Sequence, residues 1–101
     1  MDVLEAMQKR FSCRTYLNKE VKDETLYKIL EYANYAPSAG NLQTWRFIIV
    51  KDKNKKEDLA EACVKQDFIT EAPILIVICG DEAYMQRFYK TKGSLYCIQE
   101  C

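Results

Sequence analysis

The segment Ala36–Phe47, with the sequence APSAGNLQTWRF, places the strongest constraint on how this chain can fold. It follows a segment with helical periodicity and precedes a segment of strand-forming residues, so it must connect a helix to a strand. A plain connection needs one or two turn residues, whereas this one also carries several amide and hydroxyl side chains. Polar loops held between regular elements are the usual place where a scaffold presents a ligand site. We therefore predict a binding loop here.

A second candidate site lies upstream, in the sequence Arg10-Phe11-Ser12-Cys13-Arg14. Its two guanidinium groups stand four residues apart, with a hydroxyl group midway between them. Arginine and serine side chains can bind a phosphate through charge-assisted hydrogen bonds, which are partly bidentate for arginine. Residues 1–22 contain three acidic residues and five basic ones, Lys9, Arg10, Arg14, Lys19 and Lys22. This local positive excess favours an anion site, although the spacing alone is more typical of solvated surface charges.

The composition is that of an ordinary soluble globular domain. Of the 101 residues, 49% are apolar and 30% are charged, so a single domain with a core of its own is expected. The formal net charge is zero, so no global field recruits nucleic acid or an anionic membrane. The longest apolar run, Pro73–Cys79, is too short for a bilayer, which takes about 20 residues. The N-terminal residues lack an apolar signal core, and we expect a cytoplasmic protein.

The chain has five cysteines, no Cys-x-x-Cys pair and no histidine. These features argue against a zinc site of the common type and against thioredoxin-like chemistry, so no metal ligand is assigned. Acyl transfer through a Ser-His or Cys-His pair is excluded because histidine is absent. An odd number of cysteines without disulfide-rich spacing indicates reduced thiols, and each is interpreted as a small buried hydrophobe.

Hydrophobic periodicity predicts a mixture of helices and strands. The clearest helix carries apolar residues at three- and four-residue spacing and ends before Pro37. The run at Ile74–Cys79 is predicted to be a fully buried central strand. Residues Phe11–Glu20 are expected to be irregular or extended. The predicted helices are Asp2–Lys9, Asp23–Ala36 and Lys56–Val64, and the other predicted strand is Phe47–Val50.

A helical apolar stripe begins near the C-terminus, on Leu95, Ile98 and Cys101. The sequence stops there without a helix cap, and a helix of two turns is marginal in water on its own. We therefore expect the chain to be part of a longer unit.

Placed together, Arg10-x-Ser12-x-Arg14 and the segment from Pro37 to Trp45, PSAGNLQTW, resemble the nitroreductase family of FMN-dependent oxidoreductases. That family typically opens with a helix, an R-x-S-x-R segment, a helix ending in P-S-x-x-N-x-Q-P-W, and a strand. The same order extends over essentially the whole chain. One departure is Thr44, where the family usually has proline, and this implies a looser turn.

The resemblance implies an α+β fold, with a sheet and helices in three layers. It implies one nitroreductase-like domain over residues 1–101 that is the N-terminal part only, truncated after the start of the central dimer helix. It also implies a homodimer.

The resemblance assigns FMN as the cofactor and two groups of binding residues. In the first motif, Arg10 and Arg14 would pair with the FMN phosphate, Ser12 would donate a hydrogen bond, and Phe11 belongs to the same contact segment. In the loop, Asn41 and Gln43 would hydrogen-bond the flavin edge or the ribityl hydroxyls, unless they serve only local turn chemistry. The loop's small residues would pack against the ring of a cofactor held mainly by the partner subunit, and these residues are Pro37, Ser38 and Ala39.

The implied activity is transfer of hydride from NADH or NADPH through the flavin to a nitroaromatic, a quinone or a similar acceptor. No catalytic side chain is assigned, because the flavin carries the redox chemistry. Trp45 is interpreted as core or interface packing. Tyr84, Phe88 and Tyr89 could line a substrate face, but such a stripe is more often core. The alternative function is a non-catalytic or incomplete flavin-binding fragment with a structural or dimerisation role.

Overall fold

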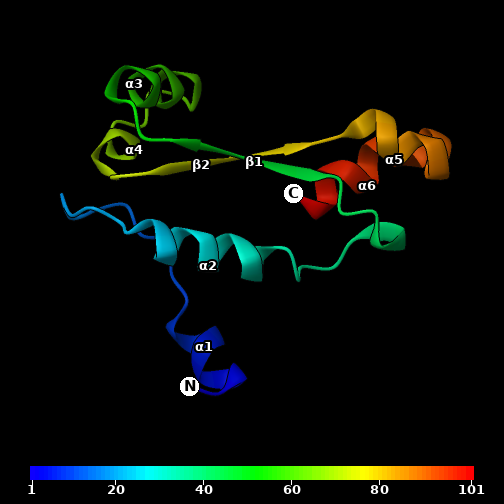
Figure 1. The fold of residues 1–101 in the computed structure, drawn as a ribbon, viewed down its shortest axis with the longest axis horizontal. Coiled ribbons are helices and arrows are strands. Elements are labelled where there is room, and N and C mark those ends of the chain that lie inside the picture. The colour runs from blue at the N-terminus through cyan, green and yellow to red at the C-terminus, as the bar shows by residue number, and fades with distance from the viewer.

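The computed structural model describes residues 1–101 and contains both helices and strands (Figure 1). Two short 3-10 helices, η1 (Ala39–Asn41) and η2 (Lys90–Lys92), accompany the longer elements. The strands are β1 (Trp45–Val50) and β2 (Leu75–Gly80). The α-helices are α1 (Val3–Lys9), α2 (Asp23–Ala33), α3 (Lys53–Ala62), α4 (Phe68–Glu71), α5 (Glu82–Tyr89) and α6 (Gly93–Glu100). None of these helices has the length and apolarity that crossing a membrane requires.

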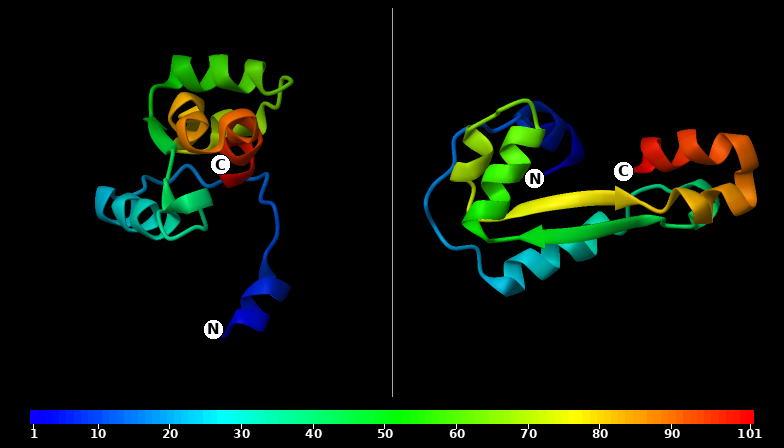
Figure 2. Two further views of the ribbon diagram at one scale, coloured as in Figure 1. Left: turned by 90° about the vertical axis from the view of Figure 1, so that its right-hand side faces the viewer. Right: turned by 90° about the horizontal axis from the view of Figure 1, so that it is seen from above.

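The two strands form an antiparallel ribbon, around which the helices are arranged (Figures 1 and 2). Trp45 pairs with Gly80 at one end of the ribbon and Val50 pairs with Leu75 at the other. Helix α2 runs along one side of the ribbon, α3 and α4 lie at the Val50 end, and α5 and α6 lie at the Trp45 end (Figure 1). The fold is therefore α+β, with the loop before β1 next to α6.

Aspartate side chains set the starts of three helices. Asp2, Asp52 and Asp81 each accept a hydrogen bond from a backbone N–H three residues later, which satisfies one unpaired donor of the first turn. The predicted helix at Asp2–Lys9 is confirmed. Because Asp52 is a cap, α3 begins at Lys53, earlier than the predicted Lys56.

Helix α2 ends at Ala33, three residues before the predicted end at Ala36. The amides of Tyr35 and Ala36 bond to carbonyls three residues back, so the chain tightens into 3-10 geometry. The α conformation is disfavoured for a residue that precedes proline, and Pro37 follows directly. The predicted boundary at Pro37 therefore marks the end of the turn rather than the end of the helix.

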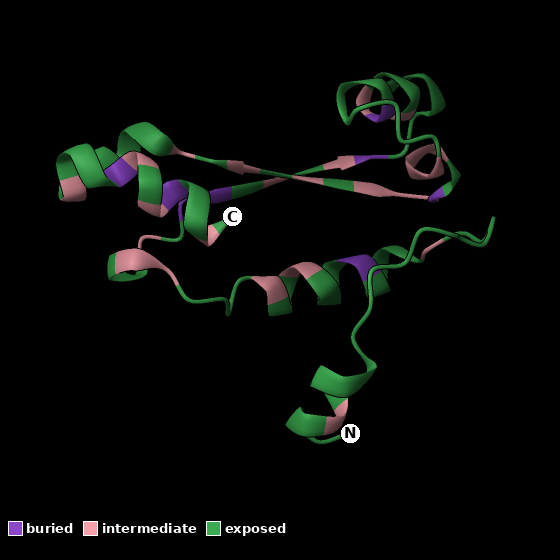
Figure 3. Cartoon of the chain, turned by 180° about the vertical axis from the view of Figure 1, so that it is seen from behind, coloured by how far each residue is buried: buried purple, intermediate pink, exposed green.

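Few residues of this chain are buried (Figure 3). Nine of the 101 residues are buried, and of the apolar ones only Trp45 and Val50 lie in the strands, while the others lie in the helices or next to them. The prediction of a fully buried strand at Ile74–Cys79 is wrong for this chain. Ile76 and Ile78 are 37% and 47% exposed. Ile78 lines open pockets together with residues of α6 and of the C-terminal end of α2, so these helices approach the strand without covering it fully.

The interpretation of the cysteines as buried hydrophobes is correct for only some of them. Cys97 is buried and Cys79 is half-buried, but Cys13, Cys63 and Cys101 are exposed. All five are free thiols in the structure.

Helices α5 and α6 pack closely because Gly93 has no side chain. A Cβ at Gly93 would lie 2.7 Å from Cα and 2.8 Å from the backbone nitrogen of Gln86. We expect Gly93→Ala to lower the free energy of unfolding by about 1–3 kcal/mol, because the backbone of α5 must move. Urea denaturation measures this change, with Gln99→Ala on the exposed side of α6 as the control. A Gly93→Ala variant as stable as the unmodified chain, or more stable through its better helix propensity, would contradict this packing.

Candidate functional site

The first candidate segment lies on the surface between α1 and α2. Arg10, Phe11, Ser12 and Arg14 are all exposed. Neither guanidinium group makes a hydrogen bond or an ion pair, and the Ser12 hydroxyl has no partner in the chain. Two free cations and a hydroxyl within five residues are a donor set that fits a phosphate group.

The second candidate segment is a loop with an unusual backbone. Gly40, Asn41 and Gln43 have φ values of 59°, 55° and 50°, in the left-handed region. Asparagine tolerates this region better than most residues, but for glutamine the conformation is strained. The contacts around the loop must therefore hold it in place.

Several of those contacts come from the end of α2 and from within the loop. The Gln43 side-chain amide donates to the carbonyl oxygen of Asn34 at 3.1 Å, and the Gln43 backbone N–H donates to Ser38 Oγ at 2.8 Å. The Trp45 indole N–H donates to Asn34 Oδ1 at 2.9 Å. Trp45 is 6% exposed, which confirms its interpretation as a packing residue. The Gln43 side chain serves turn chemistry in this structure, which was the alternative to a ligand contact.

Thr44 is the last residue of the loop, and its hydrogen bonds hold the loop more firmly than the resemblance implied. It is fully buried, and its carbonyl oxygen accepts a hydrogen bond from the Asp81 backbone at 2.9 Å. Its backbone N–H donates to Glu100 Oε1 at 3.0 Å, and its hydroxyl donates to the same oxygen. A proline at this position would have neither donor. The prediction that threonine loosens the turn is therefore wrong.

Glu100, in the last turn of α6, is a residue that the sequence did not single out. Its Oε2 accepts from the Ser38 hydroxyl at 2.7 Å and from the Ala39 backbone N–H at 3.3 Å. Partial burial alone would raise the pKa of Glu100, but the hydrogen bonds from Thr44, Ser38 and Ala39 outweigh it and hold the pKa below its ordinary value. The carboxylate is thus ionised at neutral pH and joins α6 to both ends of the loop.

This pKa predicts how stability depends on pH. Glu100 contributes fully above its unfolded pKa, and the contribution is lost as the pH falls through the lower pKa of the folded state. We expect Glu100→Gln to be less stable than the unmodified chain at neutral pH, with a smaller difference in acid. Urea midpoints measured across this range test the expectation, with the exposed Glu31→Gln as control. A stability difference that stays constant from neutral pH into acid would contradict it.

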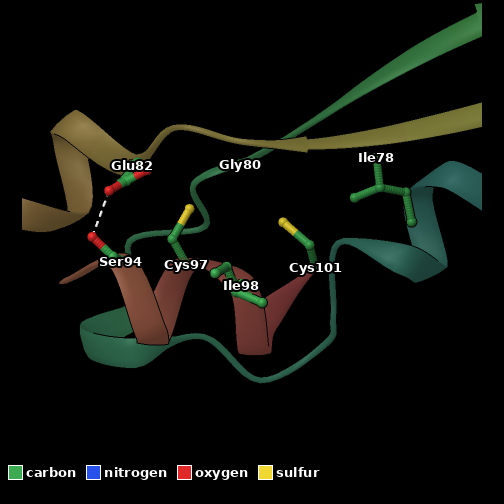
Figure 4. A pocket seen from close by; sticks show the side chains of 7 residues that line it. All are labelled: Ile78, Gly80, Glu82, Ser94, Cys97, Ile98 and Cys101. Atoms are coloured by element: carbon green, nitrogen blue, oxygen red, sulfur yellow. Dashed lines mark hydrogen bonds between the residues drawn. The ribbon is translucent and has the colours of Figure 1, made fainter. Parts of the chain in front are cut away.

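A cavity of about 260 Å³ lies on the other side of α6, between this helix and the end of β2 (Figure 4). Cys97 and Cys101 point into it, beneath Gly80. Desolvation, reinforced by the nearby Cys97 and Glu100 side chains, raises the pKa of the Cys101 thiol. The thiol is therefore protonated at neutral pH and is a poor nucleophile.

The aromatic residues of α5 do not form a core. Tyr84 and Phe88 are 38% and 58% exposed and pack edge to face, with ring centroids 5.6 Å apart. Tyr89 is half-buried, and a Cβ at Gly40 would lie 2.6 Å from its hydroxyl oxygen. The core interpretation is wrong for Tyr84 and Phe88, and the glycine lets Tyr89 approach the loop.

The structure does not bring the two candidate segments together within one chain. The Arg10–Arg14 segment passes near the N-terminal end of α2, whereas the loop continues from its C-terminal end (Figure 1). Helix α2 has 11 residues and is therefore about 16 Å long. A small pocket of about 220 Å³ lies beside the loop, lined by Pro37, Ser38, Ala39, Tyr96, Gln99 and Glu100.

Comparisons with known proteins show the family of this chain. The family model described as the nitroreductase family matches residues 7–101. A candidate NADH dehydrogenase/NAD(P)H nitroreductase of Methanothermobacter thermautotrophicus is 37% identical over all of this chain, which covers 50% of that protein. An NADH dehydrogenase of Thermus thermophilus is 42% identical over 80% of this chain and 40% of its own length. An FMN reductase of Bacillus subtilis is 32% identical over 79% of this chain and 32% of its own length.

Solved structures show the same relationship. An FMN-dependent nitroreductase from Clostridium difficile superimposes with a TM-score of 0.76 and 34% identity, over 97% of this chain and 57% of that one. NfrA2 of B. megaterium superimposes with a TM-score of 0.83 and 27% identity, over 96% of this chain and 44% of that one. The chain spans half or less of the length of the curated relatives described above.

Proposed function

Because the chain belongs to the nitroreductase family, we propose that it forms part of an FMN-dependent NAD(P)H oxidoreductase. The observation that carries this proposal is the pair of exposed, unpartnered arginines around Ser12, in a chain that also holds a strained polar loop. The names of two relatives support the cofactor, since one is an FMN reductase and another an FMN-dependent nitroreductase. The formal net charge is zero and no helix could span a membrane, so neither observation favours nucleic acid or a membrane as a partner. We propose a cytoplasmic location.

In this proposal the first motif holds the phosphate end of FMN. Arg10 and Arg14 neutralise the phosphate charge, Ser12 donates a further hydrogen bond, and Phe11 contacts the same end of the cofactor. These side chains lose no existing partner when they bind, because all are exposed and free. Binding therefore costs only the ordering of the side chains and their loss of hydration.

The loop contacts the ring end of FMN. Pro37, Ser38 and Ala39 offer small side chains, which allow the backbone to approach a planar ligand closely. Asn41 has an exposed side chain with no hydrogen bond in the chain, so it is free to bond the polar edge of the flavin. Gln43 must release its bond to Asn34 to do the same. When bound, the flavin supplies the redox chemistry, by taking hydride from NADH or NADPH and passing it to a nitroaromatic, a quinone or a similar acceptor.

We also propose that the functional unit is a homodimer whose two chains share each cofactor site. The phosphate segment and the loop lie at opposite ends of α2, so two copies could each supply one segment to the same FMN. Exposed apolar side chains on several elements offer contact surface for a second copy, among them Ile29, Ile48, Leu95 and Ile98. Light scattering of the flavin-loaded protein tests this, and a stable monomer with bound FMN would refute it.

The separation of the two segments also favours a second candidate function. A chain that brings only one segment to each flavin would bind it weakly, and its role would be structural or in dimerisation rather than catalytic. The discriminating experiment measures bound flavin and the oxidation of NADH and NADPH, with a quinone and a nitroaromatic as acceptors. Flavin-dependent oxidation supports the oxidoreductase, whereas a folded chain without bound flavin or turnover supports the second candidate.

A further inference from the structure

The carboxylate of Glu100 accepts hydrogen bonds from three residues of the loop. Oε1 accepts both donors of Thr44, and Oε2 accepts the Ser38 hydroxyl and the Ala39 N–H. The Ser38 hydroxyl in turn accepts the Gln43 N–H at 2.8 Å. One side chain, 56 to 62 residues away in sequence, therefore satisfies donors at both ends of the loop.

The loop needs such support because of its backbone. Non-glycine residues in the left-handed region are strained, and Asn41 and Gln43 both lie there. Hydrogen bonds that involve an ionised group are the strongest available to a protein side chain. The Glu100 carboxylate thus opposes the relaxation of the loop toward an ordinary backbone conformation.

Close packing keeps Glu100 within reach of the loop. A Cβ at Gly80 would collide with Cys97 Sγ and would lie 3.1 Å from Cys101 Sγ, so the missing side chain lets α6 approach the end of β2 (Figure 4). On the same helix, Cys97 Sγ lies 3.7 Å from the Thr44 hydroxyl oxygen. Helix α6 is therefore fixed against the end of the ribbon where Trp45 pairs with Gly80, which is where the loop enters β1.

We propose that Glu100 is the positioning residue of the ring-binding loop, and that it sets flavin affinity through the loop backbone. The inference rests on the proposed FMN site. Because Glu100 acts on the loop and not on the phosphate segment, its loss should affect FMN and riboflavin equally, since both contain the same ring. In contrast, loss of Arg10 or Arg14 should affect FMN alone, because riboflavin has no phosphate.

Glu100→Gln is the sharpest test variant, because it keeps the shape of the side chain. Its amide group presents hydrogens where Oε2 accepted the Ala39 N–H, so at least one hydrogen bond is lost. We expect binding of FMN and of riboflavin to weaken by the same factor, about tenfold. The visible absorption band of flavin bound to the variant at saturation should also shift, because the loop no longer holds the same groups around the flavin ring. Glu31→Gln, the same replacement at an exposed glutamate of α2 whose side chain makes no hydrogen bond, is the matched control.

Amide hydrogen exchange on the flavin-free chain gives a readout that does not depend on the cofactor. In Glu100→Gln we expect faster exchange at Ala39, Gln43 and Thr44, with no change at the amides of β1 beyond Trp45. Ser38→Ala removes one donor of the same carboxylate, and it should change exchange and affinity in the same direction if Glu100→Gln does not fold.

Unchanged exchange at the loop amides of a folded variant would overturn the positioning role. Faster exchange with unchanged flavin affinity would overturn the link to the cofactor, and so would weaker binding of FMN alone. If the unmodified chain binds neither flavin, the proposed function fails and this inference fails with it. Exchange would then still show separately whether Glu100 holds the loop.

Discussion

Replacing Arg10 and Arg14 together with alanine is expected to weaken FMN binding by about two to four decades. A hydrogen bond to a charged group contributes about 1.5–3 kcal/mol, which corresponds to one to two decades of affinity for each arginine. Both side chains are exposed and unpartnered in the structure, so their removal leaves no buried group without a partner and creates no cavity. The loss of affinity should therefore come from the phosphate contact and not from the fold.

The measurement is a titration with FMN and, in parallel, with riboflavin. The double variant should retain the riboflavin affinity of the unmodified chain. Lys19→Ala, which removes another exposed positive charge from the same segment, is the control for general electrostatic attraction. Unchanged FMN affinity in the double variant, or an equal loss for Lys19→Ala, would refute the phosphate assignment.

Trp45→Ala is expected to lower the free energy of unfolding by about 3–5 kcal/mol, the usual cost of removing a buried tryptophan. Trp45 is 6% exposed in a chain with nine buried residues, so it is a large part of the interior. It also ties β1 to the end of α2, through the bond from its indole N–H to Asn34 Oδ1. Urea denaturation followed by circular dichroism measures the change.

Trp45→Phe keeps most of the packing contribution. It leaves an aromatic ring in the interior and removes the N–H donor and the volume of the second ring, while the acceptor Asn34 is exposed and can bond to water. We expect a loss of about 1 kcal/mol or somewhat more. A folded Trp45→Phe variant that loses flavin binding entirely would show that Trp45 contacts the ligand, against its assignment to packing.

The local elements could be predicted from the sequence because their signals are local. Apolar periodicity marks α1, α2 and α3, and β-branched runs mark β1 and β2. The failures occurred where a second element decides the outcome. Whether Ile76 and Ile78 are buried depends on how closely other elements pack on the ribbon, and both stay more than one-third exposed in this chain.

The same division applies to the candidate site. The motif around Ser12 and the polar loop were visible, because their residue types are adjacent in sequence. Glu100 was missed because its role depends on donors 56 to 62 residues away, and a glutamate in an amphipathic helix gives no signal by itself. The closest available clue was Thr44, since a residue with an N–H in place of proline can be paired with an acceptor. The roles of the other site residues remain predictions.

The most direct test of the central claim is an equilibrium titration of the unmodified chain with FMN and with riboflavin, followed by flavin fluorescence and visible absorption. The account predicts saturable binding of FMN that is at least about tenfold tighter than that of riboflavin, because the phosphate adds contacts to Arg10 and Arg14. Absence of saturable FMN binding by the folded chain, or equal affinity for the two flavins, would contradict it.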